Sequence, residues 1–343
     1  MKVLITGGLG FVGRHFAKRL LDDGHTVAIV DNMYLGVELY DWMFKPNGWD
    51  EKTRSVPNLQ LMIGDCRSFF ASAPPGSLWS SSRFDLIIHC AAIVGGRVKI
   101  EDDPLEVALD LAIDSEFFRW VTISKPMPKV VYFSSSAVYP LELQTREKHV
   151  ALAESYVDLS QNRWSKPDMT YGFTKFAGEY LAKFAHEKYG LDVAIYRPFG
   201  GYGEDQDPKT YPFPAIIKRV IDGDNPVMVW GSGDQERDWI HVDDIVDAVL
   251  STYPKLYGKT LNLGTGIPTS FFELAEKIAY LAAAGDVYPS VRNDPLKPEG
   301  VFSRVADIHE MSKLYTPKIG LAEGIQRALA RASGGLDRAK AKV

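Results

Sequence analysis

The sequence predicts an α/β protein built on a doubly wound parallel sheet, with a smaller mixed lobe towards the carboxyl terminus. Short hydrophobic runs alternate with longer amphipathic segments from residue 2 onwards, and this rhythm is typical of parallel strands joined by helical crossovers. The first run, Lys2–Thr6, leads directly into a segment with four glycines in seven residues, as expected where a strand turns sharply into a helix. With 343 residues, the chain is long enough for one large domain and a second lobe.

The expected strands are continuously hydrophobic rather than alternating, which fits a sheet covered by helices on both faces. They span Lys2–Thr6, Thr26–Val30, Leu59–Ile63, Leu86–Cys90, Val130–Ser134, Val193–Tyr196 and, late in the chain, Leu261–Leu263. The expected helices span Arg14–Leu21, Pro104–Thr122 and Tyr171–Tyr189, and in the two long ones apolar residues recur three and four positions apart. Residues 40–58 and Phe69–Arg83 show no clear period and are expected to be loops.

Charge and cysteine content exclude several classes of protein. The net charge is -5, so the chain has no overall basic character that would favour nucleic acid or an anionic membrane. No stretch approaches the about 18 uninterrupted apolar residues of a membrane-spanning helix. Cys66 and Cys90 are too few for a metal cluster or a disulfide framework, and His89 and His241, beside apolar runs, are expected to be core residues rather than ligands. We therefore expect a cytoplasmic protein without a metal site, which binds neither nucleic acid nor membrane.

The glycine-rich segment has the context of a dinucleotide-binding turn, because it follows a strand and opens a helix. We expect Gly8 to permit the tight turn, Gly10 to let backbone amides approach a pyrophosphate, and Gly13 to let helix and strand pack closely. Asp31, at the end of the second strand, is placed to accept hydrogen bonds from an adenosine ribose. Since a carboxylate there would repel a 2′-phosphate, the sequence favours NAD over NADP as the cofactor.

Six short segments, in this order along the chain, resemble those of one enzyme family. They are Thr6–Gly13, Gly64–Asp65, His89–Ala92, Ser134–Tyr139, Tyr171–Lys175 and Gly231–Asp238. Together they make the chain similar to the extended short-chain dehydrogenase/reductase family, the NAD-dependent nucleotide-sugar epimerases and dehydratases, over most of its length. The nearest-looking branch is that of GDP-mannose 3,5-epimerase and GDP-fucose synthase, because of the segments Ala91–Gly96, Tyr139–Pro140 and Pro298–Val301, with Arg304 and Asp307.

Tyr171 and Lys175 are four residues apart, so they share one face of the predicted helix. A fixed ammonium favours the phenolate, and so lowers the pKa of a tyrosine towards the range of a general base. The resemblance implies that Tyr171 takes the proton from a sugar hydroxyl, that Lys175 also binds the nicotinamide ribose, and that Ser135 hydrogen-bonds the reacting oxygen. Ser134 and Ser136 are the alternatives for the last role.

The resemblance also implies which residues hold the two ligands. The cofactor NAD would contact Gly7, Gly10, Phe11, Val12, Gly13, Asp31, Asn32, Asp65, Cys66, Ala91, Ala92, Tyr171 and Lys175. The nucleotide-diphosphate sugar would contact Val94, Gly95, Ser136, Arg237 and Arg304, since bidentate arginines suit diphosphate oxygens. The family's asparagine that helps to place the diphosphate is replaced here by Gly200.

A departure from the family pattern narrows the reaction. Two residues after the catalytic Ser/Thr, the 4,6-dehydratases have an acid and the 3,5-epimerases a cysteine, but this chain has Ala137. What remains is oxidation and re-reduction at one carbon, which is C4 epimerisation through a 4-keto intermediate. A substitute acid at Glu154, at Asp158 or just after Gly96 would restore a dehydratase or 3,5-epimerase reaction. A keto-sugar reductase is a further alternative of the same fold, and a non-catalytic NAD-binding module is a remote one.

These assignments predict the domain organisation. Residues 1–198 form an NAD-binding Rossmann domain with a returning strand near 240–264, and residues 199–239 and 265–330 form the substrate-binding lobe. Residues 331–343, which contain two adjacent glycines followed by charged residues, are expected to be a flexible tail. The resemblance further implies a homodimer, in which the two long helices of each protomer pair into a four-helix bundle.

Overall fold

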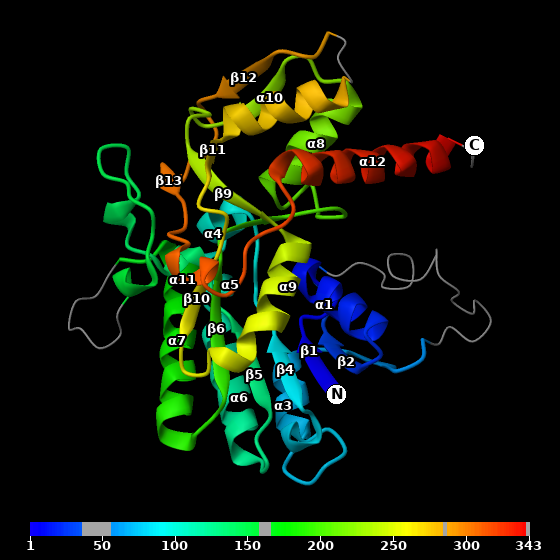
Figure 1. Ribbon diagram of the computed structural model, residues 1–343, viewed down its shortest axis with the longest axis vertical. Helices are drawn as coiled ribbons and strands as arrows, with labels where there is room; N and C mark the ends of the chain where they lie inside the picture. Colours follow the sequence, from blue (N-terminus) through cyan, green and yellow to red (C-terminus); the bar gives the residue numbers. More distant parts are fainter. Residues whose placement is uncertain (36–55, 158–165, 284–286, 341–343) are drawn as a thin grey trace.

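The computed structural model describes residues 1–35, 56–157, 166–283 and 287–340, so the predicted loop at 40–58 lies mostly outside the described residues. Figure 1 shows a parallel sheet with helices on either side in the lower part of the view, and short strands with later helices in the upper part.

The lower part is built on a sheet of seven parallel strands, as the sequence predicted. The strands are β1 (Lys2–Thr6), β2 (Thr26–Asp31), β3 (Leu59–Ile63), β4 (Leu86–His89), β5 (Lys129–Phe133), β6 (Val193–Pro198) and β10 (Thr260–Leu263). They lie in the order β10-β6-β5-β4-β1-β2-β3, and every neighbouring pair is parallel. The late strand therefore returns to the sheet, beside β6. The strand order reverses between β1 and β4, and at such a switch point the carboxyl ends of the strands leave a crevice for ligands.

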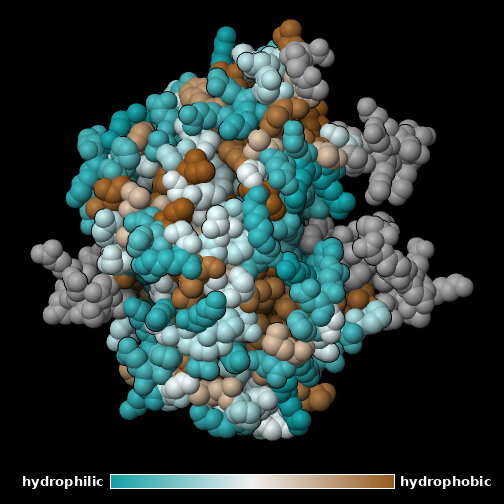
Figure 2. Space-filling view, in the orientation of Figure 1, coloured by the Kyte–Doolittle hydropathy of each residue, from teal (hydrophilic) through white to brown (hydrophobic). Residues whose placement is uncertain are grey.

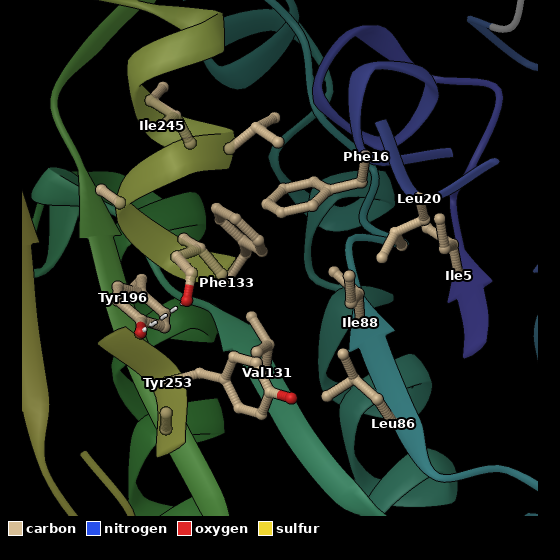
Figure 3. Close-up of a cluster of buried hydrophobic side chains, with 14 of the residues drawn as sticks. Ile5, Phe16, Leu20, Leu86, Ile88, Val131, Phe133, Tyr196, Ile245 and Tyr253 are labelled. Carbon is tan, nitrogen blue, oxygen red and sulfur yellow. Dashed lines mark hydrogen bonds between the residues drawn. The ribbon is translucent and has the colours of Figure 1, made fainter. Parts of the chain in front are cut away.

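Helices cover both faces of this sheet. One face carries α1 (Phe11–Asp22) and α9 (Val242–Thr252), and the other carries α3 (Cys66–Ser72), α6 (Asp110–Ile123) and α7 (Met169–Tyr189). Figure 3 shows Phe16 of α1 and Ile245 of α9 among the side chains of the strands, with Phe16 close to Phe133. Full burial of one such side chain stabilises the fold by about 1.5–3 kcal/mol. These two buried clusters confirm that the strands are covered on both sides.

The segment Phe69–Arg83, predicted to be a loop, begins inside a helix. Asp65 caps α3 by accepting the backbone N–H of Arg67 at 2.8 Å, and the side chains of Phe69 and Phe70 are buried. The loop prediction was therefore wrong for its first residues, because burial of two adjacent aromatic rings overrides the proline- and serine-rich composition that follows.

The predicted helix Pro104–Thr122 is broken in two. A turn at Ala108 and Leu109 separates α5 (Pro104–Val107) from α6. Asp110 and Asp114 of α6 are buried, whereas Leu109 is 42% exposed. The apolar stripe that we inferred from the spacing thus faces partly outwards, and two carboxylates share the buried face of α6 with apolar residues such as Ile113 and Phe117. By contrast, α7 confirms the second long helix and begins two residues earlier than predicted.

The upper part has its own hydrophobic core. Its strands are β7 (Gly200–Tyr202), β8 (Val227–Trp230), β9 (Glu236–His241), β11 (Pro268–Ser270), β12 (Val291–Asp294) and β13 (Ser303–Arg304), and its longer helices are α8 (Pro212–Asp222), α10 (Phe271–Ala282) and α12 (Leu321–Lys340). Strand β9 pairs with β7, β11 and β13, while β12 pairs with β8. Since β9 runs directly into α9, the two parts of the molecule are joined by a short, structured connection. The remaining helical segments are α4 (Arg97–Asp102), α11 (His309–Ser312) and 3-10 turns at Ser81–Arg83, Ser136–Val138, Leu141–Leu143, Glu154–Tyr156 and Tyr253–Lys255.

The tail predicted to begin at residue 331 is instead helical as far as Lys340, because α12 continues through it. Ile325 and Leu329 of α12 are buried, and the guanidinium of Arg331 pairs with Asp205 at 2.9 Å. The pairing of Arg331 therefore holds the first residue of the predicted tail against the upper part.

One face of the molecule, shown in Figure 2, is covered mainly by hydrophilic residues, with hydrophobic residues in scattered groups. Within the described ranges, no helix combines the length and the hydrophobicity needed to cross a bilayer.

Candidate active site

The turn after β1 is folded tightly around its glycines. Gly7 has a φ of +68°, and a Cβ at this position would lie 2.7 Å from the backbone nitrogen of Ala91. Gly7 therefore makes the tight turn, rather than Gly8 as predicted, since Gly8 is not one of the glycines with a positive φ. A Cβ on Gly13 would lie 2.7 Å from the Cα of Gly8, which agrees with the close packing expected of Gly13.

The start of α1 suits an anionic group. Gly10 precedes the helix and has no side chain that could cap it. The amides of Phe11 and Val12 thus lie at the positive end of the helix dipole, without a side-chain cap from Gly10. A pyrophosphate fits such a helix start, and the missing Cβ atoms of the turn allow it to approach the backbone.

Asp31 lies against the same turn. Its Oδ2 accepts the backbone N–H of Leu9 at 2.9 Å, and its Oδ1 accepts that of Met33 at 2.7 Å. The neighbouring Asn32 is exposed, and its side-chain oxygen accepts the backbone N–H of Tyr34 at 3.1 Å. A buried carboxylate fixed beside the turn accepts a ribose hydroxyl and repels a phosphate, so the residues present fit NAD better than NADP.

Asp65 and Cys66 stand at the start of α3. The guanidinium of Arg67 binds the Asp65 carboxylate at 2.6 Å, and this hydrogen bonding lowers the pKa of Asp65. The thiol of Cys66 is buried, and burial raises its pKa to about 12. Asp65 therefore pairs with Arg67 and Cys66 belongs to the hydrophobic core, and their contact with the adenine end of the cofactor stays a prediction.

The loop that follows β4 connects the glycine turn with the upper part of the molecule. At its start, the backbone N–H of Ala91 lies 3.4 Å from the Thr6 hydroxyl, and Ala92 follows it. At its end, a Cβ on Gly96 would collide with the carbonyl oxygen of Thr210. Val94 and Gly95 precede this contact, so the predicted cofactor residues lie at the start of the loop and the predicted substrate residues near its end.

The three serines after β5 differ in their surroundings. The Ser135 hydroxyl lies near enough to the Tyr171 phenol to lower its pKa. Ser134 instead donates its hydroxyl to the buried carboxylate of Glu179 at 2.5 Å, and Ser136 is buried at the start of a 3-10 turn. The geometry therefore favours Ser135 over Ser134 as the partner of Tyr171.

The ionisation of Tyr171 is governed by opposing effects. Burial raises its pKa, while the charge of Lys175 and the hydrogen bond from Ser135 lower it, and the net direction is upwards. The predicted net fall in the pKa is therefore wrong for this structure, although the effect of Lys175 itself has the predicted sign. Lys175 is buried too, but Asp114 and Asp110 outweigh the effect of burial and raise its pKa.

The two aspartates of α6 are the residues that sequence reasoning missed. Asp114 accepts a hydrogen bond from the Tyr132 hydroxyl at 2.5 Å and lies 3.1 Å from Nε2 of His89. His89 is a buried core residue, as predicted. The available signal was a pair of acids four residues apart, and therefore on one face of the helix, which a search for apolar periodicity passes over.

Arg237 and Arg304 lie side by side, as partners in the parallel pairing of β9 and β13. Arg304 is bonded to Asp168 at 2.8 Å. In the described part of the chain, the guanidinium of Arg237 donates to two carbonyl oxygens, those of Glu236 and Val301. Burial and the charge of Arg304 lower the pKa of Arg237 to about 9. Two adjacent, partly buried guanidinium groups, of which one is bonded to a carboxylate, favour a ligand with negative charges.

A cavity of about 680 Å³ opens beside these arginines. Its walls include Arg97, Asp168 and Gly300, and a Cβ on Gly300 would lie 3.5 Å from Nη2 of Arg237. Arg97, which the sequence analysis did not single out, binds Asp168 at 3.0 Å. The volume is within the range of small-molecule sites in proteins.

The structure also bears on the glycine at position 200 and on the candidate substitute acids. A Cβ on Gly200 would lie 2.5 Å from the carbonyl oxygen of Asp238, so the asparagine of the family pattern does not fit here. The carboxylate of Glu154 accepts the backbone N–H of Asn262 in β10 at 2.8 Å, so this acid is held at the sheet, away from the partners of Tyr171. Asp158 lies outside the described residues.

Comparison with known proteins decides the family. The pattern of the NAD dependent epimerase/dehydratase family matches residues 3–43 and 72–264. The chain belongs to this family. A UDP-glucose 4-epimerase of Mycolicibacterium smegmatis is 27% identical over 344 residues, covering 96% of this chain and 97% of the relative. A protein of Oryza sativa subsp. japonica that carries a GDP-L-fucose synthase name is 30% identical over 335 residues, covering 95% and 85%.

The fold of the epimerase/dehydratase family is also found among solved structures. A dTDP-glucose 4,6-dehydratase of Streptomyces venezuelae, solved with NAD bound, superposes with a TM-score of 0.80 at 22% identity, and 98% of each chain is covered. These findings confirm the predicted family, its doubly wound fold and NAD as its cofactor.

Proposed function

We propose that this member of the family is a nucleotide-sugar 4-epimerase. The observation that carries the proposal is the group formed by Ser135, Tyr171 and Lys175 at the carboxyl ends of the strands, with Ala137 next to it. Lys175, one helical turn after Tyr171 on α7, and the hydroxyl of Ser135 both lower the pKa of Tyr171. Ala137 is buried and presents only a methyl group, so this position has no second group able to transfer a proton.

In this reaction the side chains of the protein transfer the proton of the C4 hydroxyl. When bound, NAD supplies a hydride acceptor, then a hydride donor, and a positive charge on its oxidised ring. Tyr171 takes the proton of the C4 hydroxyl as the C4–H bond breaks, and Ser135 hydrogen-bonds the same oxygen. The 4-keto sugar then rotates so that its opposite face receives the hydride. Tyr171 returns the proton to the oxygen of the inverted C4 centre. Lys175 stabilises the phenolate throughout, against the opposing effect of burial.

A dehydratase or a 3,5-epimerase needs another acid or base beside the sugar. Ala137 cannot act as one, and Glu154 is bonded to the backbone of β10. The residue directly after Gly96 is Arg97, which binds the carboxylates of Glu101 and Asp168. These observations favour the reaction that needs one proton-transferring group, with elimination or 3,5-epimerisation as the alternative.

The paired arginines support a nucleoside diphosphate as the carrier of the sugar. Arg237 and Arg304 offer guanidinium groups next to the cavity, and bidentate guanidinium suits diphosphate oxygens. The relatives named above are named for UDP-, GDP- and dTDP-sugars, so the base and the sugar must be determined by experiment.

A panel of UDP-, GDP- and dTDP-hexoses tests this proposal on the purified protein. We expect one nucleotide group to be converted to its C4 epimer, detected by proton NMR, with no net consumption of NAD or NADH. Heat denaturation should release NAD rather than NADP, identified by mass spectrometry. Stoichiometric use of a reduced cofactor would make the protein a reductase, and a 4-keto-6-deoxy product would make it a dehydratase.

We also propose a homodimer formed through α6 and α7. On α7, Tyr180 and Phe184 are 54% and 47% exposed, and Leu105 and Leu109 beside α6 are 82% and 42% exposed. Large apolar side chains exposed on neighbouring helices are typical of an interface. Sedimentation equilibrium at micromolar concentration should give twice the chain mass, and Phe184→Lys should shift the protein towards the monomer. A monomeric natural protein at this concentration contradicts the proposal.

The division of labour within the chain is a proposal as well. Residues 1–198 with the segment near 240–264 would hold NAD, and residues 199–239 and 265–330 would hold the sugar nucleotide. We further propose a cytoplasmic location, where the two free cysteines, Cys66 and Cys90, stay reduced.

A further inference from the structure

Helix α6 packs against α7, which carries Tyr171 and Lys175, and has two buried carboxylates that take no part in the reaction proposed above. Asp110 and Asp114 of α6 are each 1% exposed. The hydroxyl of Tyr132 donates to Asp114, and the ring of the same tyrosine lies 5.5 Å from Nζ of Lys175. Both aspartates raise the pKa of Lys175 and of Tyr171. A buried charge is costly unless it is paired, so the presence of two such acids needs a reason.

Asp114 is held on both of its oxygens. The Tyr132 hydroxyl donates to Oδ2 at 2.5 Å, and Nε2 of His89 lies 3.1 Å from Oδ1. Nδ1 of His89 in turn lies 2.7 Å from the hydroxyl of Thr6, the last residue of β1. A Cβ on Gly178 would overlap both the Tyr132 hydroxyl and Oδ2 of Asp114. The glycine in α7 thus makes room for the acid, and Asp114 is a fixed part of the packing between the sheet and its helices.

Asp110 is held on one oxygen only. Its Oδ1 accepts the backbone N–H of Ile93 at 2.6 Å, which ties α6 to the loop that follows β4. Among the described residues, its Oδ2 is buried and has no hydrogen-bond partner. Burial raises the pKa of Asp110 to about 6, while the charge of Lys175 opposes this shift.

The charges explain why Lys175 stays an ammonium in a buried place. Burial alone lowers the pKa of a lysine, yet the pKa of Lys175 is raised, chiefly by Asp114 and Asp110. The same carboxylates disfavour the phenolate of Tyr171. They therefore keep the cation in place and, at the same time, prevent Tyr171 from losing its proton too readily.

We propose that Asp110 is a positioning residue for the pair Tyr171 and Lys175. With one oxygen it clamps the loop at Ile93, and with its charge, shared with Asp114, it holds Lys175 as an ammonium and moderates the acidity of Tyr171. This inference rests on the proposed function, because Asp110 would act through the two residues that carry out the proposed proton transfer.

Several other groups face this cluster and do not change in the test. The groups around Tyr171 are Ser135, which follows β5, and Tyr211, which precedes α8. The groups around Lys175 are His89 at the end of β4 and Cys90 directly after it. The ring of Tyr132 in β5 lies 5.5 Å from Nζ of Lys175. Asp110 itself interacts electrostatically with Lys175, Tyr171 and Asp114.

The variant Asp110→Asn separates charge from structure, because an amide oxygen can still accept the Ile93 N–H. With the negative charge gone, Tyr171 loses its proton more easily. The acid limb of the kcat profile should move to lower pH by about one half to one unit, the size expected for one charge several ångströms away. Asp110→Ala also removes the clamp, so it should show the same shift and, in addition, about tenfold weaker retention of NAD.

A readout that does not depend on turnover comes from tyrosinate absorbance in cofactor-free protein. The difference between each protein and its Tyr171→Phe counterpart reports the titration of Tyr171 alone, and its midpoint should fall in Asp110→Asn. Asp222→Asn, which removes an exposed carboxylate of α8 paired with Lys218, is the control and should leave both profiles unchanged. If Asp110→Asn does not fold, Asp114→Asn is expected to shift the midpoint in the same direction.

The two levels of inference fail in different ways. An active natural protein with an unchanged midpoint and an unchanged acid limb in Asp110→Asn overturns the role of Asp110 and leaves the epimerase proposal intact. A natural protein that converts no nucleotide sugar overturns the proposed function, whereas the tyrosinate midpoint still tests the charge relation between Asp110 and Tyr171.

Discussion

Tyr171→Phe is expected to lower kcat by about 10³-fold, the size of effect typical of a lost general acid–base group. In the proposed mechanism the phenol oxygen takes the proton of the C4 hydroxyl, and the hydroxyl of Ser135 cannot replace it because an aliphatic hydroxyl is much less acidic than a phenol. The ring itself remains, so the packing of α7 and the pocket around Lys175 should be unchanged. The measurement is the initial rate of epimerisation under saturating nucleotide sugar, with bound NAD quantified after heat release.

Tyr280→Phe is the matched control for this experiment. Tyr280 lies on α10 and its side chain is 56% exposed, so the same chemical change there should leave kcat within about twofold of the natural protein. A Tyr171→Phe protein that turns over at the natural rate, with NAD bound, would remove the tyrosine from the mechanism. Loss of bound NAD would show instead that the phenol oxygen serves binding.

Arg197→Met is expected to lower the free energy of unfolding by about 3–5 kcal/mol, because it leaves a buried carboxylate without its partner. Arg197 is 1% exposed, and its guanidinium binds both oxygens of Glu179, each at 2.7 Å. Ser134 also donates to Glu179, but a hydroxyl cannot neutralise the charge. Urea unfolding followed by circular dichroism measures the loss.

The double variant Arg197→Met with Glu179→Leu distinguishes the charge from the packing. Because it removes both ions, it should regain most of the lost stability. Lys218→Met breaks an exposed ion pair with Asp222 on α8 and should change the free energy of unfolding by less than about 1 kcal/mol. Equal losses in the single and the double variant would mean that packing, rather than the unpaired carboxylate, sets the stability at this place.

Much of the lower part could be predicted because its signals are local. Each strand is a short hydrophobic run, and the glycines after Thr6 mark the turn whatever surrounds it. The spacing of Tyr171 and Lys175 on one helix likewise needs no knowledge of the rest of the chain. Where local composition and tertiary burial disagree, as at Phe69 and Phe70, the prediction was wrong, since a buried aromatic pair can order a segment that its composition marks as loop.

The sequence by itself predicted the seven strands of the parallel sheet, the glycine turn and the spacing of Tyr171 and Lys175 on one helix, because each depends on residues close together in the chain. Tertiary structure alone decided that α6 turns its acids inwards, that Ser135 rather than Ser134 meets Tyr171, and that Arg237 lies beside Arg304. These pairings join segments far apart in sequence, and the ionisation of Tyr171 depends on burial and on charges that no local pattern contains.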